Sequence, residues 1–324
     1  MPRIPTDTAF TRAFGLGLPV VQAPMGGVCT PRFVAAAAEA GALGMLPIWM
    51  LPPDAARAAV AELRALTARP VAVNLRADRD QDALIAIAAG EGVDLAHLFW
   101  GDPGRAAPAV RRAGARMIAT VSDADTAKAA LDAGAVGLIA QGAEAGGHVF
   151  GTTPLEALLP QVTALAGDTP VAAAGGVTSN AAAARAFALG ASAVVLGTRL
   201  LVAEESEAHP DYKAALIAAS GADTALTLCF DGGWPDAPHR VLRNSTFRAW
   251  EAAGSPPAGA RPGEGEAIGR DPRGAEIPRY HCSPPRGGVT GEIEAMCLYA
   301  GAGVGEITRV QPLRAILDEV MTGA

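Results

Sequence analysis

Residues 170–198 read PVAAAGGVTSNAAAARAFALGASAVVLGT and contain one full unit of the pattern that decides the fold. An apolar run ends in Gly175-Gly176, and an Ala-rich helical stretch follows. Leu189-Gly190-Ala191 then leads into a second apolar run, which ends in Gly197-Thr198. Glycine readily adopts the left-handed conformation that commonly ends a helix. The stretch therefore predicts a strand, a helix and a second strand, with a glycine turn after each strand.

The same junction between helix and strand recurs upstream, at Ala40-Gly41-Ala42, Ala113-Gly114-Ala115 and Ala133-Gly134-Ala135. The apolar runs are continuous rather than alternating, as expected for strands that are covered on both faces. Eight strand–helix units fit a closed (β/α)8 barrel (TIM barrel), whereas the alternative, an open doubly wound sheet, normally needs fewer units. We expect the strands at about residues 18–23, 44–48, 70–75, 94–99, 115–120, 136–141, 170–174 and 193–197.

The composition restricts the class of protein. The 324 residues are 50% hydrophobic, and the formal net charge of −7 argues against a nucleic-acid binder, which needs clustered Lys and Arg. The four cysteines lack metal-ligand spacing, which predicts reduced thiols in a cytoplasmic protein. No apolar stretch approaches the length of a membrane span. We therefore expect no membrane or nucleic-acid partner, and we leave open whether the protein forms a homodimer.

The repeating pattern stops near residue 220, which divides the chain into three predicted parts. Residues 1–220 are expected to form the barrel, and residues 292–324 are expected to return to it. Residues 221–291 are rich in Pro, Gly and Arg and contain five aromatic residues. The aromatic residues favour a small subdomain that covers the barrel mouth over a disordered surface segment. They are Phe230, Trp234, Phe247, Trp250 and Tyr280.

Glycines occur where a barrel enzyme often binds phosphate. In such enzymes the active site lies at the carboxyl ends of the strands, and a phosphate often binds after strands seven and eight. The predicted seventh strand ends at Ala174 and runs into Gly175 and Gly176, while the eighth runs into Gly197 and Thr198. Glycine lets backbone N–H groups approach an anion closely, and threonine adds a hydroxyl donor. Two such turns favour a phosphate site over ordinary tight turns.

The segment after the predicted sixth strand reads QGAEAGGH, from Gln141 to His148. Gly146 and Gly147 let the backbone pass close to a flat ligand, and histidine is the side chain best suited to moving a proton near neutral pH. We therefore expect His148 to be a catalytic general base, with a packing histidine as the alternative. Glu144 is expected to be structural. The remaining histidines have no ligand spacing, so no metal site is predicted.

Two further strand ends offer groups to a ligand. The first strand ends in Ala23, Pro24, Met25 and Gly26, where proline and glycine expose backbone groups. A plain turn explains this end equally well. The third strand ends near Asn74, whose side-chain amide both donates and accepts hydrogen bonds. That amide suits the edge of a planar ring and the cap of the next helix equally.

These four segments together resemble the nitronate monooxygenase family, formerly called 2-nitropropane dioxygenases. The resemblance covers most of residues 15–220, and a weaker similarity returns at Leu298–Glu306. It implies an FMN-dependent barrel with a small substrate domain, which oxidises an alkyl nitronate or nitroalkane with O2. The QGAEAGGH run is specific for this superfamily of flavin barrels and less specific for one activity within it.

The resemblance also implies roles for individual residues. His148 matches the histidine that accepts a proton from the carbon next to the nitro group. Backbone groups of Met25 and its neighbours contact the flavin, and Asn74 and Gln141 approach its ring system. The flavin phosphate is held by the glycine turns, namely Gly175, Gly176, Gly197 and Thr198.

One position departs from the family pattern and leaves other activities open. Many members carry a second histidine just before the turn after strand four, where this chain has Phe99. His97 lies two residues away at the same strand parity, so it is expected on the same side of the strand. The alternatives are a flavin-dependent reductase, of the enoyl-acyl carrier protein or NADH:quinone type, and a flavin-binding barrel without activity.

Overall fold

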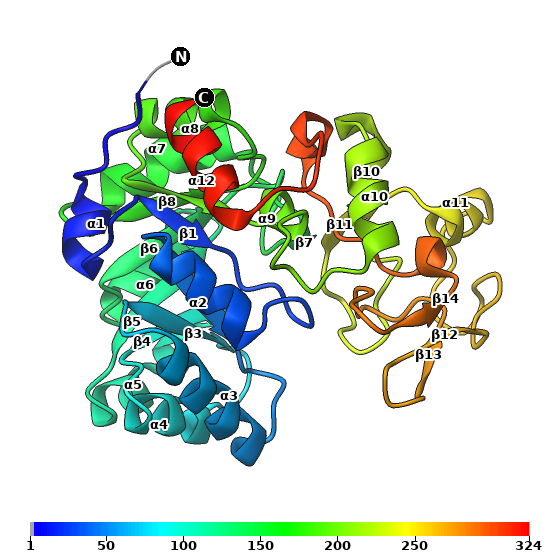
Figure 1. The fold of residues 1–324 in the computed structure, drawn as a ribbon, viewed down its shortest axis with the longest axis horizontal. Coiled ribbons are helices and arrows are strands. Elements are labelled where there is room, and N and C mark those ends of the chain that lie inside the picture. The colour runs from blue at the N-terminus through cyan, green and yellow to red at the C-terminus, as the bar shows by residue number, and fades with distance from the viewer. Residues whose placement is uncertain (1–2, 324) are drawn as a thin grey trace.

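The computed structural model describes residues 3–323, and its main body is a closed barrel of eight parallel strands (Figure 1). The strands follow one another around the barrel in chain order, and β9 pairs with β1 to close it. The predicted barrel is confirmed, and the open sheet is excluded. All eight expected strands are present, with ends shifted by at most two residues: β1 (Val20–Gln22), β2 (Leu43–Pro47), β3 (Val71–Arg76), β4 (Leu95–Phe99), β5 (Arg116–Val121), β6 (Gly137–Gln141), β8 (Val171–Ala174) and β9 (Ala193–Leu196).

Helices cover the outside of the barrel. The place after β9 is filled by α12 (Leu313–Thr322), which packs against α8 and α2 and appears in red beside α8 in Figure 1. The helix ends follow the sequence pattern, because Gly41, Gly114, Gly134 and Gly190 all have positive φ. The other barrel helices are α2 (Pro31–Glu39), α3 (Pro53–Leu66), α4 (Asp82–Gly90), α5 (Ala107–Arg112), α6 (Ala124–Asp132), α7 (Leu155–Ala166) and α8 (Asn180–Ala188).

A short helix that the sequence analysis missed, α1 (Ala9–Phe14), closes the amino-terminal end of the barrel. Thr8 caps its first turn, and Gly15, with a φ of 68°, ends it. Phe10 and Phe14 are buried against side chains inside the barrel, among them Leu43 and Ile118. The amino-terminal half of the barrel is therefore filled with apolar side chains. A ligand must enter from the end where the carboxyl ends of the strands lie, which we call the mouth.

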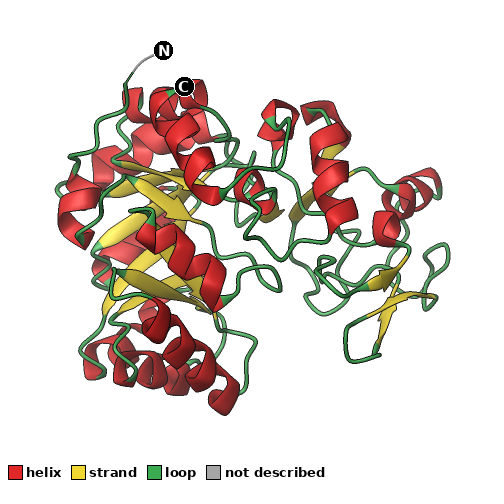
Figure 2. Ribbon diagram, viewed as in Figure 1, coloured by secondary structure: helices red, strands yellow, loops and turns green. Residues whose placement is uncertain are grey.

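Residues 197–312, between β9 and α12, form a loop-rich excursion beside the barrel (Figure 2). One antiparallel sheet joins β10 (Thr224–Thr227) and β11 (His239–Leu242) to β7 (Gly147–His148), a strand from the loop after β6. The segment that carries His148 is thereby tied to the excursion. The remaining elements are α9 (Thr198–Leu201), α10 (Pro210–Ala218), α11 (Ser245–Ala252), and a second sheet of β12 (Ala267–Arg270), β13 (Glu276–Pro278) and β14 (Thr290–Gly291).

Candidate active site

The glycine turns form one side of the barrel mouth. Gly175 and Gly176 have φ angles of 121° and 69°, a conformation that residues with a side chain rarely adopt. Among the described residues, no oxygen accepts a hydrogen bond from the backbone N–H of Gly175, Gly176 or Thr198. Thr198 Oγ1 accepts one from the Gly301 N–H at 2.9 Å, which leaves the hydroxyl proton free. These donors fit a phosphate group.

The turn before β7 completes this side of the mouth. A Cβ atom on Gly146 would lie 2.5 Å from the backbone N of Gly301, so only glycine fits there. Gly147 has a φ of 78°, and no atom lies within 4 Å of a Cβ placed on it. Glycine is therefore favoured there by the backbone conformation and not by a lack of space. Ala174, at the end of β8, is a small buried residue that packs against the interior of the barrel. Backbone from three loops therefore encloses the site.

The end of β1 is held in place by Gln22 and Cys29. The Gln22 amide donates to the Ala23 carbonyl and, at 3.2 Å, to the Cys29 sulfur, which also accepts from the Met25 N–H at 3.2 Å. Burial raises the pKa of Cys29 to about 12, so the thiol stays protonated. Pro24 lies within this loop and Gly26 packs directly beside Met50, so backbone forms this edge of the mouth.

Asn74, His97 and Thr120 form a buried hydrogen-bonded row across β3, β4 and β5. Asn74 Nδ2 lies 3.1 Å from His97 Nδ1, and His97 Nε2 lies 2.8 Å from Thr120 Oγ1. Because the amide donates to Nδ1, Nε2 carries the ring proton and donates to the threonine. Burial lowers the pKa of His97 to about 3, so the ring is neutral. Leu95, at the same parity on β4, packs inside the barrel, so His97 and Phe99 share that side of the strand, as predicted.

The side chain of Gln141 is hydrogen-bonded to the segment that carries His148 and holds that segment in place. Its amide nitrogen donates to the His148 carbonyl at 3.1 Å, and its oxygen accepts from the Phe150 N–H at 3.0 Å. Glu144 accepts from the Leu155 N–H at 2.9 Å, at the start of α7, and its expected role as a structural residue or polar helper stays a prediction. Gln141 and Glu144 therefore both hold the loop that carries His148.

The imidazole of His148 lies at the mouth with one nitrogen available. Its Nε2 is fully buried and has no hydrogen-bond partner among the described residues. The ring stacks on Trp234 at 3.9 Å between centroids. Its pKa is lowered to about 3, chiefly by burial, with smaller contributions from His239 and the positive charge of Arg76. The imidazole is therefore neutral at neutral pH, which is the form that accepts a proton.

His239 lies opposite His148 in the β7–β11 pair, and its contacts are structural. Its Nε2 accepts from the Phe230 N–H at 3.1 Å, so Nδ1 carries the proton and donates to the Ala237 carbonyl at 2.9 Å. Both nitrogens are occupied, unlike those of His148. The sequence analysis gave His239 no role, and only the strand pairing brings it here.

Opposite the glycine turns lies an aromatic cluster, which we define as Trp49, Phe99, Trp100, Phe150 and Trp234. Trp100 has a φ of 62°, a strained conformation for a residue of this size. The buried guanidinium of Arg76, at the end of β3, packs over Trp234 with 3.5 Å between its carbon and the ring centre. Apart from Trp234, in the segment predicted to cover the mouth, and Phe99, at the position of the family's second histidine, sequence analysis missed this group. A charged residue ending an apolar strand was the available signal for Arg76.

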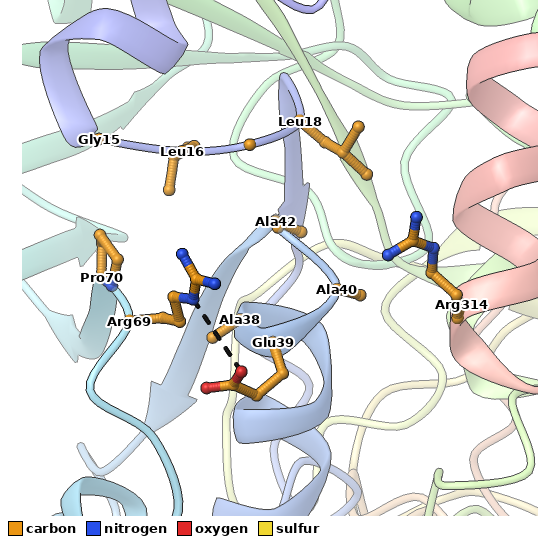
Figure 3. Close-up of a pocket in the computed structure, with 12 residues that line it drawn as sticks. Gly15, Leu16, Leu18, Ala38, Glu39, Ala40, Ala42, Arg69, Pro70 and Arg314 are labelled. Atoms are coloured by element: carbon orange, nitrogen blue, oxygen red, sulfur yellow. Dashed lines mark ion pairs between the residues drawn. The ribbon is translucent and has the colours of Figure 1, made fainter.

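A separate pocket of about 260 Å³ lies at the other end of the barrel (Figure 3). It is bordered by the loop before β1, the end of α2 and the start of β3, with Arg69 directed towards Glu39. Arg69 and Glu39 are both exposed, and no histidine or cysteine lines the pocket. We therefore place the candidate site at the mouth. No cluster of potential metal ligands exists within residues 3–323, and none of the helices described there is long and apolar enough to cross a membrane.

The comparisons with known proteins place this barrel among the flavin-dependent oxidoreductases. The family model for nitronate monooxygenase matches residues 7–92 and 85–323. The chain therefore belongs to the nitronate monooxygenase family, which confirms the resemblance inferred from its motifs.

Individual relatives carry different activities. The nitronate monooxygenase of Pseudomonas aeruginosa is 31% identical over 299 residues, covering 76% of this chain and 83% of that protein. A (3aS,4S,5R,7aS)-5-hydroxy-7a-methyl-1-oxo-octahydro-1H-indene-4-carboxyl-CoA dehydrogenase of Rhodococcus jostii is 35% identical over 249 residues, covering 76% and 69%. The structure of FabK from Thermotoga maritima superposes with a TM-score of 0.82 at 29% identity, covering 98% and 96%. These similarities establish that the chain is a flavin-dependent oxidoreductase. Its substrate has to be inferred from the residues of the site.

Proposed function

We propose that this chain binds FMN at the barrel mouth and oxidises alkyl nitronates with O2. The observation that carries the proposal is a buried His148 Nε2 without a hydrogen-bond partner, found together with backbone N–H groups from which no described residue accepts a hydrogen bond. Bound FMN would supply the electron acceptor, a chemistry that no side chain provides. Gly175, Gly176, Gly197 and Thr198 would hold its phosphate, and the residues assigned to its ring system are Ala23, Pro24, Met25, Gly26, Asn74, Gln141, Gly146, Gly147 and Ala174.

The chain's own part in the reaction is proton transfer and shielding. With a neutral nitroalkane as substrate, His148 Nε2 accepts the proton from the carbon next to the nitro group, and the resulting imidazolium stabilises the anion. With a preformed nitronate no proton needs to be removed. The row of Asn74, His97 and Thr120 and the aromatic cluster exclude water from the reacting atoms. A pKa of about 3 makes His148 a weak base before the substrate anion forms, so nitronates suit the site better than neutral nitroalkanes.

Replacing the base separates the two substrates. We expect His148→Asn to lower kcat/KM for a neutral nitroalkane by about 10²- to 10⁴-fold, because general base catalysis contributes that much. Turnover of the preformed nitronate should change only a few-fold. The measurement is oxygen consumption with each substrate, and His209→Asn, at the start of α10, is the control. Equal losses on both substrates would contradict the base role.

A reductase is the second candidate, and the similarity to a CoA dehydrogenase and to FabK favours it. Anaerobic mixing decides between the two activities. Bleaching of the flavin by NADH would support the reductase, whereas bleaching by a nitronate alone would support the monooxygenase. A yellow protein that is inert to nitronates, NADH and quinones would support a binding barrel without activity.

The remaining proposals concern the surroundings of the protein. The four cysteines are free thiols in the structure, which supports the proposed cytoplasmic location. The proposed partners are the small-molecule substrate and O2. A homodimer stays a prediction, which sedimentation of the purified protein tests.

A further inference from the structure

The mechanism leaves the aromatic cluster with only a shielding role. Trp234 lies 5.2 Å from Trp49 and 5.3 Å from Trp100 between ring centroids, and Trp100 lies 5.4 Å from Phe150. These rings come from loops after β2, β4 and β7 and from the excursion, so four separate segments bring them together. Aromatic residues make up only 5% of the chain. Their concentration beside His148 therefore calls for a ligand that uses ring contacts.

Arg76 adds an unsatisfied donor to the same place. Its side chain is 4% exposed, and its Nε and Nη2 donate to the Asp78 carboxylate at 2.9 and 2.5 Å. The third nitrogen, Nη1, is buried and has no partner among the described residues. A buried donor without a partner costs free energy, so proteins retain few of them. The other unpaired nitrogen here is Nε2 of His148, and both side chains pack on Trp234.

Asp78 fixes the plane of the guanidinium. The two hydrogen bonds to one carboxylate hold it as a rigid fork, and its face lies against the indole of Trp234. Arg79, three residues further on, is exposed and lies 5.9 Å from the ring centre of Trp49. Arg76, at the end of β3, therefore lies inside the cluster, whereas Arg79, in the loop that follows, lies exposed at its edge.

We propose that the site takes an arylalkyl nitronate, a planar anion whose aromatic ring packs against the aromatic cluster while a nitronate oxygen accepts a hydrogen bond from Arg76 Nη1. The proposal rests on the nitronate oxidation proposed above and specifies its substrate. A nitronate places negative charge on two oxygens, which suits a guanidinium donor. Conjugation with an aryl group extends the plane, which suits offset or edge contacts with tryptophan. Arg76 is thus a positioning residue. Trp234 is buried and packs against both Arg76 and His148, so it holds in place the rings of the cluster that select the aryl group.

Binding is tested with two carboxylates that resemble nitronates in shape but cannot be oxidised in this way. Phenylacetate matches the nitronate of phenylnitromethane, and propionate matches that of nitroethane. Titration of the FMN-loaded protein is followed by tryptophan fluorescence, because three of the four tryptophans lie in the cluster. We expect phenylacetate to bind about tenfold more tightly than propionate, which corresponds to about 1.4 kcal/mol, within the range of aromatic pair contacts.

Variants separate the two contacts. Arg76→Gln should weaken both carboxylates by about tenfold, as expected for loss of a charged hydrogen bond. Arg79→Gln, which replaces the exposed arginine three residues after Arg76, should leave both affinities unchanged. Trp234→Leu should remove the preference for phenylacetate and keep propionate binding. If Arg76→Gln does not fold, Arg76→Lys keeps the charge but loses the planar fork, and it should still weaken phenylacetate about threefold.

Turnover with the two nitronates completes the test. We expect kcat/KM for the nitronate of phenylnitromethane to exceed that for ethyl nitronate by about tenfold, with the preference lost in Trp234→Leu. Equal kcat/KM values, or an Arg76→Gln variant that alters the flavin spectrum but neither carboxylate affinity, would overturn this inference and leave nitronate oxidation standing. Failure to oxidise either nitronate would instead remove the proposed function itself.

Discussion

One side of the barrel mouth is formed by backbone groups, and the other side is formed by side chains. Around β8, β9 and Gly301 the molecule presents backbone, with glycines at positive φ after β8 and with N–H groups of Gly175, Gly176 and Thr198 that donate to no residue within 3–323. Around β2, β3 and β4 it presents side chains, namely the aromatic cluster and Arg76. The backbone side suits a group shared by many enzymes, such as a phosphate, whereas the side-chain side sets which substrate is chosen. Substitutions on the two sides should therefore damage different properties.

The largest effect should follow a change on the backbone side. Gly175 has a φ of 121°, and a Cβ there would lie 3.2 Å from the backbone N of Ala145. Gly175→Ala should therefore displace the turn and weaken FMN binding by about 100-fold or more, given that each tenfold loss costs about 1.4 kcal/mol. The flavin absorbance of the purified protein and an FMN titration measure this.

A variant at a second glycine distinguishes the effect of backbone strain from the loss of the phosphate site. Gly134 has a φ of 93° at the end of α6, and nothing lies within 4 Å of a Cβ placed on it. Gly134→Ala should therefore cost stability and keep FMN. If both variants retain flavin equally, the backbone side is not the phosphate site.

An intermediate effect should appear on the side-chain side as pH falls. His97 is neutral in the folded protein down to a pKa of about 3, whereas in the unfolded chain it binds a proton near pH 6.5. Acid therefore favours the unfolded chain, and stability falls by about 1.4 kcal/mol per pH unit from pH 6.5 towards 3. Between pH 7 and 5, wild type should lose about 2 kcal/mol more free energy of unfolding than His97→Gln. Urea denaturation at both pH values measures this, and identical losses would contradict it.

The smallest effect should come from a hydroxyl on the backbone side. Thr198→Val removes the acceptor for the Gly301 N–H and the hydroxyl that we propose binds the phosphate. One neutral hydrogen bond is worth about 1 kcal/mol, so FMN should bind about fivefold more weakly. Thr198→Ser keeps the hydroxyl and should restore affinity. An affinity unchanged in Thr198→Val would show that the hydroxyl serves only the loop around Gly301.

The backbone side could be predicted from sequence because its signals are local. Gly175, Gly197 and the QGAEAGGH run each follow an apolar run directly, and the eight strands were found within two residues. The side-chain side could not, because Trp49, Arg76 and Trp234 meet only after the barrel closes and the excursion packs against these side chains. The contacts of Gln141 could not be predicted for the same reason, because its two hydrogen bonds to the loop depend on the path of a turn that the sequence does not reveal.

Helix α12 has a consequence for how the chain reaches this structure. It lies between α8 and α2, yet it follows the whole excursion in the chain. During synthesis the barrel therefore emerges from the ribosome with an uncovered apolar seam, which stays open until Leu313–Thr322 have been made. Shortening the protein at this helix should expose that seam and promote aggregation, even though every strand of the barrel and every residue proposed for the site would remain.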